Sequence, residues 1–246
     1  SVAFMKYFGM LYFDKPVVAK NAGLYVKEEA IKRLQAHNPD CHLVMILRNP
    51  VERAYSAFQM EKNYGNFSGT FNEMRPLIEV GGSSDWRYEF FIKMGMYAEY
   101  IHTLYKYFPK SQISLFRFEE LRKDSLRITK QLYKILGVDS GFNPDITTKY
   151  NVTHNMRSAN YARFVMKLLK NNSALKKVAR KIIPSRHDYK IGEMLRDVNK
   201  SPDKPDTISE EMRELLTKFY VPYNNELSAL TDLDVSDWNN VSVSKK

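Results

Sequence analysis

The feature that constrains this fold most is an apolar run, residues 42–47, with a helix start directly behind it. His42-Leu43-Val44-Met45-Ile46-Leu47 is almost unbroken in its apolar character, which is typical of a parallel strand buried on both faces. Asn49 is a favourable N-cap, Pro50 suits the first helical position, and Glu52 brings negative charge to the positive end of the helix dipole. A buried strand that leads at once into a capped helix predicts an α/β fold.

Other segments continue the alternation of strands and helices. In chain order they are a strand at Pro16–Ala19, a helix from about Val26 to Gln35 that Asn38-Pro39 closes, a helix at Tyr97–Tyr107, a strand at Ile113–Phe116, and a helix capped by Asp124-Ser125 that Gly137 stops. Alternating elements of this kind predict a parallel sheet flanked by helices.

The remaining segments are less regular. Residues 64–85 lose periodicity and predict a long loop with one short helix, which in a compact domain is usually functional or mobile. Residues 161–183 form a lysine-rich amphipathic pattern that indicates either a solvated face or a surface for an anionic glycan or membrane. Thr207 and Glu210 predict a capping box for a helix through Phe219, followed by a short final helix.

Composition limits the classes of protein and partner. The 246 residues, 43% of them hydrophobic, fit a single domain over residues 1–246. A net charge of +10 favours an anionic partner. The single cysteine, Cys41, excludes an internal disulfide and favours the cytoplasm, with the Golgi lumen as the alternative if an anchor precedes the chain. We find no apolar run of membrane-spanning length, no metal-ligand spacing and no sign of nucleic-acid binding.

Arg48 is the strongest candidate for a functional side chain. It stands at the carboxyl end of the predicted strand 42–47, where open α/β sheets bind ligands. Its guanidinium matches phosphate geometry, and the helix behind it offers backbone N–H groups and a positive dipole end. Ser56 follows Arg53 by one helical turn, so both could reach the same oxyanion. The alternative is a surface arginine that pairs with Glu52.

The run Ile46-Leu-Arg-Asn-Pro-Val-Glu-Arg-Ala-Tyr-Ser56 closely resembles the 3′-phosphate-binding segment of sulfotransferases, especially the branch of heparan sulfate sulfotransferases and bacterial relatives. Later blocks resemble the same family in the same order. They are Gly95-Met-Tyr97 through Phe108-Pro109, Ile113 through Phe118-Glu119-Glu120-Leu121, Leu136-Gly137, Tyr150-Asn151-Val152-Thr153, and Pro222 through Leu227 with Trp238-Asn239. The resemblance covers most of the chain from about Lys15.

The resemblance implies a three-layer, P-loop-like α/β fold, with a parallel sheet flanked by helices. It implies transfer of a sulfuryl group from 3′-phosphoadenosine 5′-phosphosulfate (PAPS) to a hydroxyl or amine, without a metal, leaving 3′-phosphoadenosine 5′-phosphate (PAP). It implies that Arg48 and Ser56 take the 3′-phosphate. Arg53, one helical turn before Ser56, and Arg157, after the Asn-Val-Thr segment, are further candidate nucleotide contacts, and the alternative for Arg157 is an exposed arginine at a helix start. Lys20 matches a family lysine that contacts the transferring group. The acceptor can be a carbohydrate, lipid or small molecule, and the sequence does not indicate an oligomeric state.

The chain departs from the family pattern at two places. No Pro-Lys-x-Gly-Thr-Thr loop for the 5′-phosphosulfate occurs, so the family's first strand and loop are missing from this sequence. Ala19 stands where many heparan sulfate relatives have a glutamate beside the lysine. A general base must be sought elsewhere, and His154 is our candidate because it follows the Asn-Val-Thr segment.

Two functional hypotheses follow, because the missing loop bears on catalysis. The first is an active sulfotransferase that belongs to a longer protein. The second is an inactive nucleotide-binding module that keeps the 3′-phosphate grip and binds a partner. A nucleotide kinase is disfavoured, since no Gly-x-x-x-x-Gly-Lys-Ser/Thr run is present.

Overall fold

A computed structural model describes residues 16–82, 84–145, 158, 160–161, 198–199, 201 and 207–241. The chain divides into two compact units. The strand unit comprises Ser1–Arg48 and Tyr97–Lys149, and the helical unit comprises Asn49–Met96 and Tyr150–Lys246. We describe each unit by itself.

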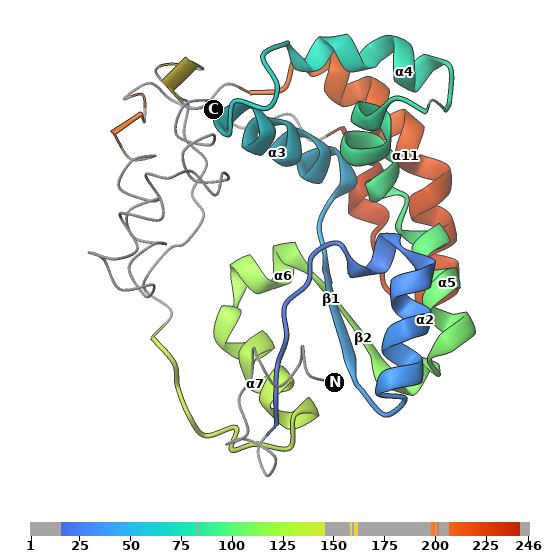
Figure 1. The fold of residues 1–246 in the computed structure, drawn as a ribbon, viewed down its shortest axis with the longest axis vertical. Helices are drawn as coiled ribbons and strands as arrows, with labels where there is room; N and C mark the ends of the chain where they lie inside the picture. Colours follow the sequence, from blue (N-terminus) through green and yellow to red (C-terminus); the bar gives the residue numbers. More distant parts are fainter. Residues whose placement is uncertain are drawn as a thin grey trace, which may run out of the picture. The chain divides into compact units, whose positions relative to one another are not determined.

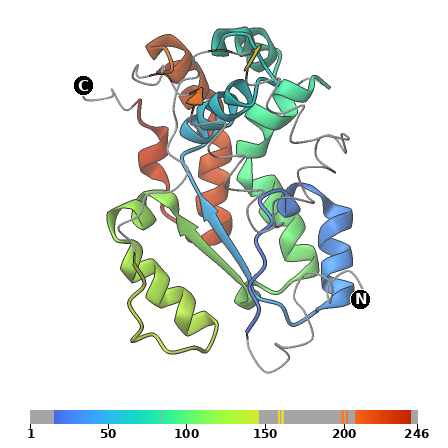
Figure 2. The ribbon, with the colours of Figure 1, turned by 60° about the vertical axis from the view of Figure 1, so that its left-hand side comes forward.

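The strand unit has a parallel pair of strands at its centre. Strand β1 (Leu43–Leu47) pairs with β2 (Ile113–Arg117), in a register that sets Leu43 opposite Ile113 and Leu47 opposite Arg117. The flanking elements in chain order are η2 (Leu24–Val26), α2 (Glu28–His37), α5 (Tyr97–Tyr107), η6 (Lys110–Gln112), α6 (Phe118–Lys123) and α7 (Ser125–Ile135). Helices α2 and α5 lie on one side of the strands, with α6 and α7 on the other (Figures 1 and 2). The predicted α/β class with a parallel sheet between helices is confirmed.

The two faces of the strand pair differ in burial. Leu43 and Met45 of β1 pack with the buried Ile31, Leu104 and Phe108 of the α2–α5 side. On the opposite face, Val44 is 41% exposed and Ile46 is 44% exposed. The prediction of a strand buried on both faces is therefore wrong, because alternate side chains point to opposite faces and only one face is well covered.

The predicted strand at Pro16–Ala19 is also wrong. Residues 16–20 form no strand in the structure, and they are exposed, with Val18 at 68%. Apolar residues with β propensity suit a strand, but a strand exists only where a neighbouring backbone completes its hydrogen-bond ladder. Lys20 therefore does not stand at the end of a strand.

Several predicted helix boundaries are confirmed by their capping contacts. The Asn49 side chain accepts a hydrogen bond from the backbone N–H of Val51 at 3.0 Å, and Pro50 is the first residue of the helix. The Asp124 side chain caps α7 in the same way, through the N–H of Arg127 at 2.9 Å. Gly137 follows α7 with a φ of +66°, a left-handed conformation that glycine adopts without strain.

The helical unit is built around α3 and α11. Its elements are α3 (Pro50–Asn63), η3 (Phe71–Met74), α4 (Arg75–Glu79), the π-helix η4 (Tyr88–Ile92), η5 (Lys93–Gly95), α11 (Glu210–Thr231) and η8 (Ser236–Asn239). Aromatic rings dominate its core, which includes Phe58, Phe71, Tyr88, Phe91 and Tyr220. These rings bury much apolar area per residue, and Phe58 packs edge-to-face against Phe91 and in a tilted arrangement against Phe71.

The irregular backbone of η4 is held by side chains from both long helices. The Arg53 guanidinium of α3 donates to the carbonyl oxygens of Phe90 and Phe91. The Tyr220 hydroxyl of α11 donates to the carbonyl oxygen of Ile92 at 2.7 Å, and Tyr220 is fully buried. A Cβ at Gly95 would lie 3.0 Å from both the Pro50 Cβ and the Tyr220 hydroxyl, so the close approach requires glycine here.

Helix α11 differs from its prediction at both ends. Its N-cap is Ser209, whose hydroxyl accepts from the N–H of Met212 at 3.3 Å, rather than Thr207. Ile208 is buried in the core, so the chain enters the helix two residues later than predicted. The helix also continues past Phe219 through Pro222. Pro222 is exposed, and it has no N–H to donate to the carbonyl of Lys218 four residues before it.

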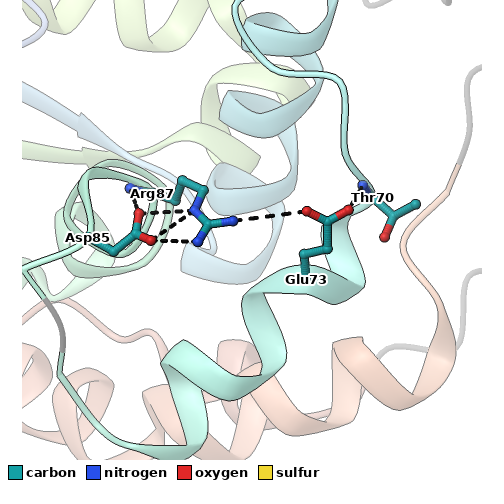
Figure 3. Close-up of polar contacts among 4 residues, drawn as sticks. All are labelled: Thr70, Glu73, Asp85 and Arg87. Atoms are coloured by element: carbon teal, nitrogen blue, oxygen red, sulfur yellow. Dashed lines mark hydrogen bonds and ion pairs between the residues drawn. The ribbon is translucent and has the colours of Figure 1, made fainter.

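The predicted loop 64–85 contains η3 and α4 and is joined to the following residues by charged contacts. Arg87 donates to both carboxylate oxygens of Asp85 at 3.0 Å, and its guanidinium lies 3.9 Å from the Glu73 carboxylate (Figure 3). Glu73 in turn accepts from the backbone N–H of Thr70 at 2.8 Å (Figure 3). These contacts link residues on both sides of α4. The predicted helix over 161–183 lies almost entirely outside the described residues.

Removal of the Tyr220 hydroxyl should destabilise the protein. Tyr220→Phe keeps the ring but leaves the buried carbonyl of Ile92 without this donor, which costs about 1–3 kcal/mol. Urea unfolding followed by circular dichroism measures the change. Tyr107→Phe is the matched control, because the hydroxyl of Tyr107 donates to Glu28 at the exposed surface, and we expect a much smaller change in stability than for Tyr220→Phe. Equal stability of Tyr220→Phe and the unaltered chain would contradict the assignment.

The contact between Asp85 and Arg87 predicts a pH dependence. Hydrogen bonds from the Arg87 side chain and backbone hold the pKa of Asp85 below its ordinary value. The contact therefore stabilises the folded state above a pH of about 4, and this contribution is lost as the pH falls through the lower pKa of the folded state. The urea midpoints of the unaltered chain and Asp85→Asn should differ most near neutral pH and converge at lower pH. A constant difference between the two across this range would refute the prediction.

Candidate anion-binding site

The candidate site begins at the carboxyl end of the parallel strands. Arg48 follows the last residue of β1, and Phe118 follows the last residue of β2. Since Leu47 and Arg117 are partners in register, the next residue along each strand also lies side by side. The Arg48 guanidinium carbon lies 5.2 Å from the centroid of the Phe118 ring, within cation–π distance. The guanidinium is thus located at the strand ends, where the sequence predicts it.

The backbone of Arg48 has a second contact within the strand unit. The Tyr97 hydroxyl donates to the Arg48 carbonyl oxygen at 2.9 Å, and Tyr97 is only 4% exposed. Sequence reasoning assigned neither Tyr97 nor Phe118 a role at the site. The pairing of β1 and β2 could have indicated Phe118, because parallel strands end at the same edge of a sheet. Nothing local in the sequence indicates the Tyr97 contact, which spans 49 residues.

The N-terminus of α3 has fewer available donors than the sequence suggests. Pro50 has no N–H group, the N–H of Val51 donates to the Asn49 side chain, and the N–H of Arg53 donates to the Asn49 carbonyl. The helix dipole remains, but these N–H groups, which the sequence analysis expected to face an anion, already have acceptors at the start of the helix. Glu52 forms an ion pair with Arg213 of α11, which gives its carboxylate a partner within the helical unit.

Arg53 and Ser56 lie on α3 in the helical unit, whereas Arg48 belongs to the strand unit. The terminal nitrogens of Arg53 donate to the carbonyls of Phe90 and Phe91, and its buried Nε has no hydrogen-bond partner among the described residues. Arg53 therefore has a structural role in holding η4, and its contact with a nucleotide stays a prediction. Ser56 is half-buried.

Of the two predicted catalytic residues, Lys20 and His154, the structure describes only Lys20. Lys20 is exposed in the segment before η2. His154 and Arg157 lie outside the described residues.

The part of the chain that the structure describes contains no group of three or more histidine, cysteine, aspartate or glutamate side chains able to hold a metal ion. It also contains no helix with the length and apolar character needed to cross a membrane.

Comparison with known sequences identifies relatives that share about half of this chain. Bifunctional heparan sulfate N-deacetylase/N-sulfotransferase 3 of Mus musculus is 27% identical over 128 residues, which is 50% of this chain and 15% of that protein. Heparan sulfate glucosamine 3-O-sulfotransferase 6 of Homo sapiens is 26% identical over 120 residues, or 48% of this chain and 34% of that protein. The chain therefore matches only a minor part of the length of these relatives.

A solved structure and a family model extend the comparison over most of the chain. The crystal structure of a sulfotransferase from Alicyclobacillus acidocaldarius aligns with a TM-score of 0.66 at 19% identity, over 97% of this chain and 74% of that one. This likeness shows a shared fold. The family model described as the sulfotransferase domain matches residues 29–223, a range that includes β1, β2 and the residues of the Arg48 segment. The chain therefore belongs to the sulfotransferase-domain family.

Proposed function

We propose that this chain binds PAPS and transfers its sulfuryl group to a hydroxyl or amine of an acceptor. The observation that carries the proposal is the location of Arg48, a half-buried guanidinium at the carboxyl ends of β1 and β2 in a chain of the sulfotransferase-domain family. Ligands of open α/β sheets bind at this edge. The stacked guanidinium presents donors that suit a phosphate.

Arg48 and Ser56 are proposed to bind the 3′-phosphate of the nucleotide. A guanidinium and a hydroxyl are donors that match a phosphate group, so the residues present fit the ligand chemically. The sequence supports their joint role, because Arg48 and Ser56 stand eight residues apart in the segment Ile46–Ser56, which resembles the 3′-phosphate-binding segment of sulfotransferases. Arg53 and Arg157 are proposed as further nucleotide contacts, and for Arg53 this requires its guanidinium to leave the carbonyls of Phe90 and Phe91.

Lys20 and His154 are proposed to act on the transferring group and the acceptor. Sulfuryl transfer, like phosphoryl transfer, spreads negative charge over equatorial oxygens and depends on positioning and electrostatics. The ammonium group of Lys20 would stabilise this charge. His154 would accept the proton from the acceptor hydroxyl or amine, provided that its imidazole is neutral at the working pH.

The acceptor is proposed to be a carbohydrate, with a lipid or small-molecule hydroxyl as the broader class. The relatives' names refer to N-sulfation and glucosamine 3-O-sulfation of heparan sulfate. A net charge of +10 would favour an anionic polymer of this kind by long-range attraction. A cytoplasmic location stays a prediction from the single cysteine.

The second candidate function is a nucleotide-binding module without transfer activity. It is favoured by one observation, the absence from residues 1–246 of any run that matches the 5′-phosphosulfate loop. Such a module would keep the Arg48 contact with the 3′-phosphate and would bind PAP and PAPS without turnover.

Arg48→Ala should weaken PAP binding strongly. Loss of a desolvated charge that pairs with phosphate costs about 2–5 kcal/mol, or about 30- to 5,000-fold in Kd. Ser56→Ala removes a neutral donor to a charged group and should cost about 1.5–3 kcal/mol. Isothermal titration calorimetry with PAP measures both.

Arg33→Ala is the matched control for the loss of positive charge. Arg33 pairs with Glu29 on α2, and its side chain is 78% exposed. Its substitution should leave Kd within about twofold, because exposed ion pairs contribute little. Equal affinities of Arg48→Ala and the unaltered chain would exclude the proposed phosphate contact.

An assay of sulfuryl transfer separates the two candidate functions. The purified chain is incubated with labelled PAPS and desulfated heparan sulfate, and labelled polymer and PAP are measured. For the enzyme we expect labelled polymer, with turnover reduced at least about 10²-fold in His154→Ala if this residue is the general base. Calorimetric PAP binding without labelled polymer or PAP would instead support the binding module.

A further inference from the structure

We propose that Tyr97 and Phe118 are positioning residues that hold Arg48 in the orientation needed to bind a phosphate. The inference rests on the proposed function, since the phosphate is that of the nucleotide. Both residues belong to the strand unit, as does Arg48. Arg48 and the two residues that contact it thus lie within one compact unit.

The hydroxyl of Tyr97 fixes the backbone of Arg48. Arg48 lies between the end of β1 and the N-cap of α3, so its carbonyl is outside both the strand and the helix. The first helical hydrogen bond of α3 runs from the N–H of Arg53 to the carbonyl of Asn49, at 2.9 Å, so it does not involve the carbonyl of Arg48. The hydroxyl of Tyr97, buried at the start of α5, donates to the Arg48 carbonyl at 2.9 Å. This bond restrains the peptide from which the guanidinium side chain extends.

The ring of Phe118 restrains the other end of the side chain. The guanidinium carbon of Arg48 lies 5.2 Å from the ring centroid. A cation held over an aromatic face is attracted by the ring, and this contact limits the orientations that the guanidinium can adopt. Arginine has a large side-chain entropy, so contacts that reduce its freedom before binding increase affinity.

The strand register explains why these residues meet. Phe118 is the first residue of α6, directly after β2, and β2 ends opposite the last residue of β1. Tyr97 is the first residue of α5, and Leu104 of this helix packs with Phe108, which follows it, into the α2–α5 side of the sheet. The sheet and its covering helix thus fix these two contacts of Arg48.

A double-mutant cycle with PAP binding tests whether the two residues act through Arg48. Tyr97→Phe should raise Kd about 3- to 10-fold, and Phe118→Leu about 3- to 20-fold. In the Arg48→Ala background the same substitutions should change Kd by less than about twofold. Phe118→Tyr keeps an aromatic ring and should restore most of the affinity. Tyr107→Phe, which loses a hydroxyl bond at the other end of α5, should bind like the unaltered chain.

A second measurement does not depend on nucleotide binding. Phenylglyoxal modifies exposed guanidinium groups, and tandem mass spectrometry assigns the modification to Arg48. Tyr97→Phe and Phe118→Leu should increase the rate of Arg48 modification several-fold, whereas Tyr107→Phe should not. Thermal denaturation identifies any variant that has simply lost its fold.

The outcomes separate this inference from the proposed function. Faster modification of Arg48 in both variants supports the inference, even if the unaltered chain fails to bind PAP, which would overturn the proposed function. Unchanged modification rates overturn the inference, whatever the affinities. An equal loss of affinity in the presence and absence of Arg48 also overturns it, because the side chain would then contact the nucleotide directly.

Discussion

The strand unit depends on the parallel pairing of β1 with β2. Their register places Leu47 opposite Arg117, so both strands end together and the next residues, Arg48 and Phe118, become neighbours. A parallel pair needs a long connection, and α5 in this connection covers one face of the sheet. The same connection brings Tyr97 to the carbonyl of Arg48. One pairing therefore sets both the core of the unit and the surroundings of its principal cation.

Side chains hold the helical unit together, because helices do not share a ladder of backbone hydrogen bonds of the kind that joins two strands. Its π-helix η4 is held by side-chain donors from α3 and α11, namely Arg53 and Tyr220. A π-helix displaces the regular sequence of helical hydrogen bonds, and side-chain donors can satisfy the carbonyls at such an irregularity. Arg53 consequently contributes more to the shape of the unit than its place in an anion-binding segment suggests.

The elements that the sequence predicts well are those specified by adjacent residues. The start of α3 depends on Asn49 and Pro50, and the end of α7 depends on Gly137, all within one helical turn of the boundary. The location of Arg48 at a strand end follows from the same local pattern. The predicted strand at Pro16–Ala19 fails because strand formation requires a partner elsewhere in the chain, which composition does not reveal. The cap of α11 moves to Ser209 because Ile208 is buried in a core assembled from distant segments.

Adjacent residues also fail to predict the roles of individual arginines. Arg48 and Arg53 are five residues apart in one family-like segment, and both have the chemistry of a phosphate ligand. The structure distinguishes the two by their contacts. The Arg48 guanidinium lies over an aromatic ring at the strand ends, whereas the Arg53 guanidinium donates to backbone carbonyls. A guanidinium whose terminal nitrogens already bind carbonyls must break those bonds before it can bind an anion, and the broken bonds would leave polar groups unsatisfied. The Arg48 guanidinium lies over the Phe118 ring at the strand ends, the edge at which open α/β sheets bind ligands, so its position suits a phosphate contact better than that of Arg53.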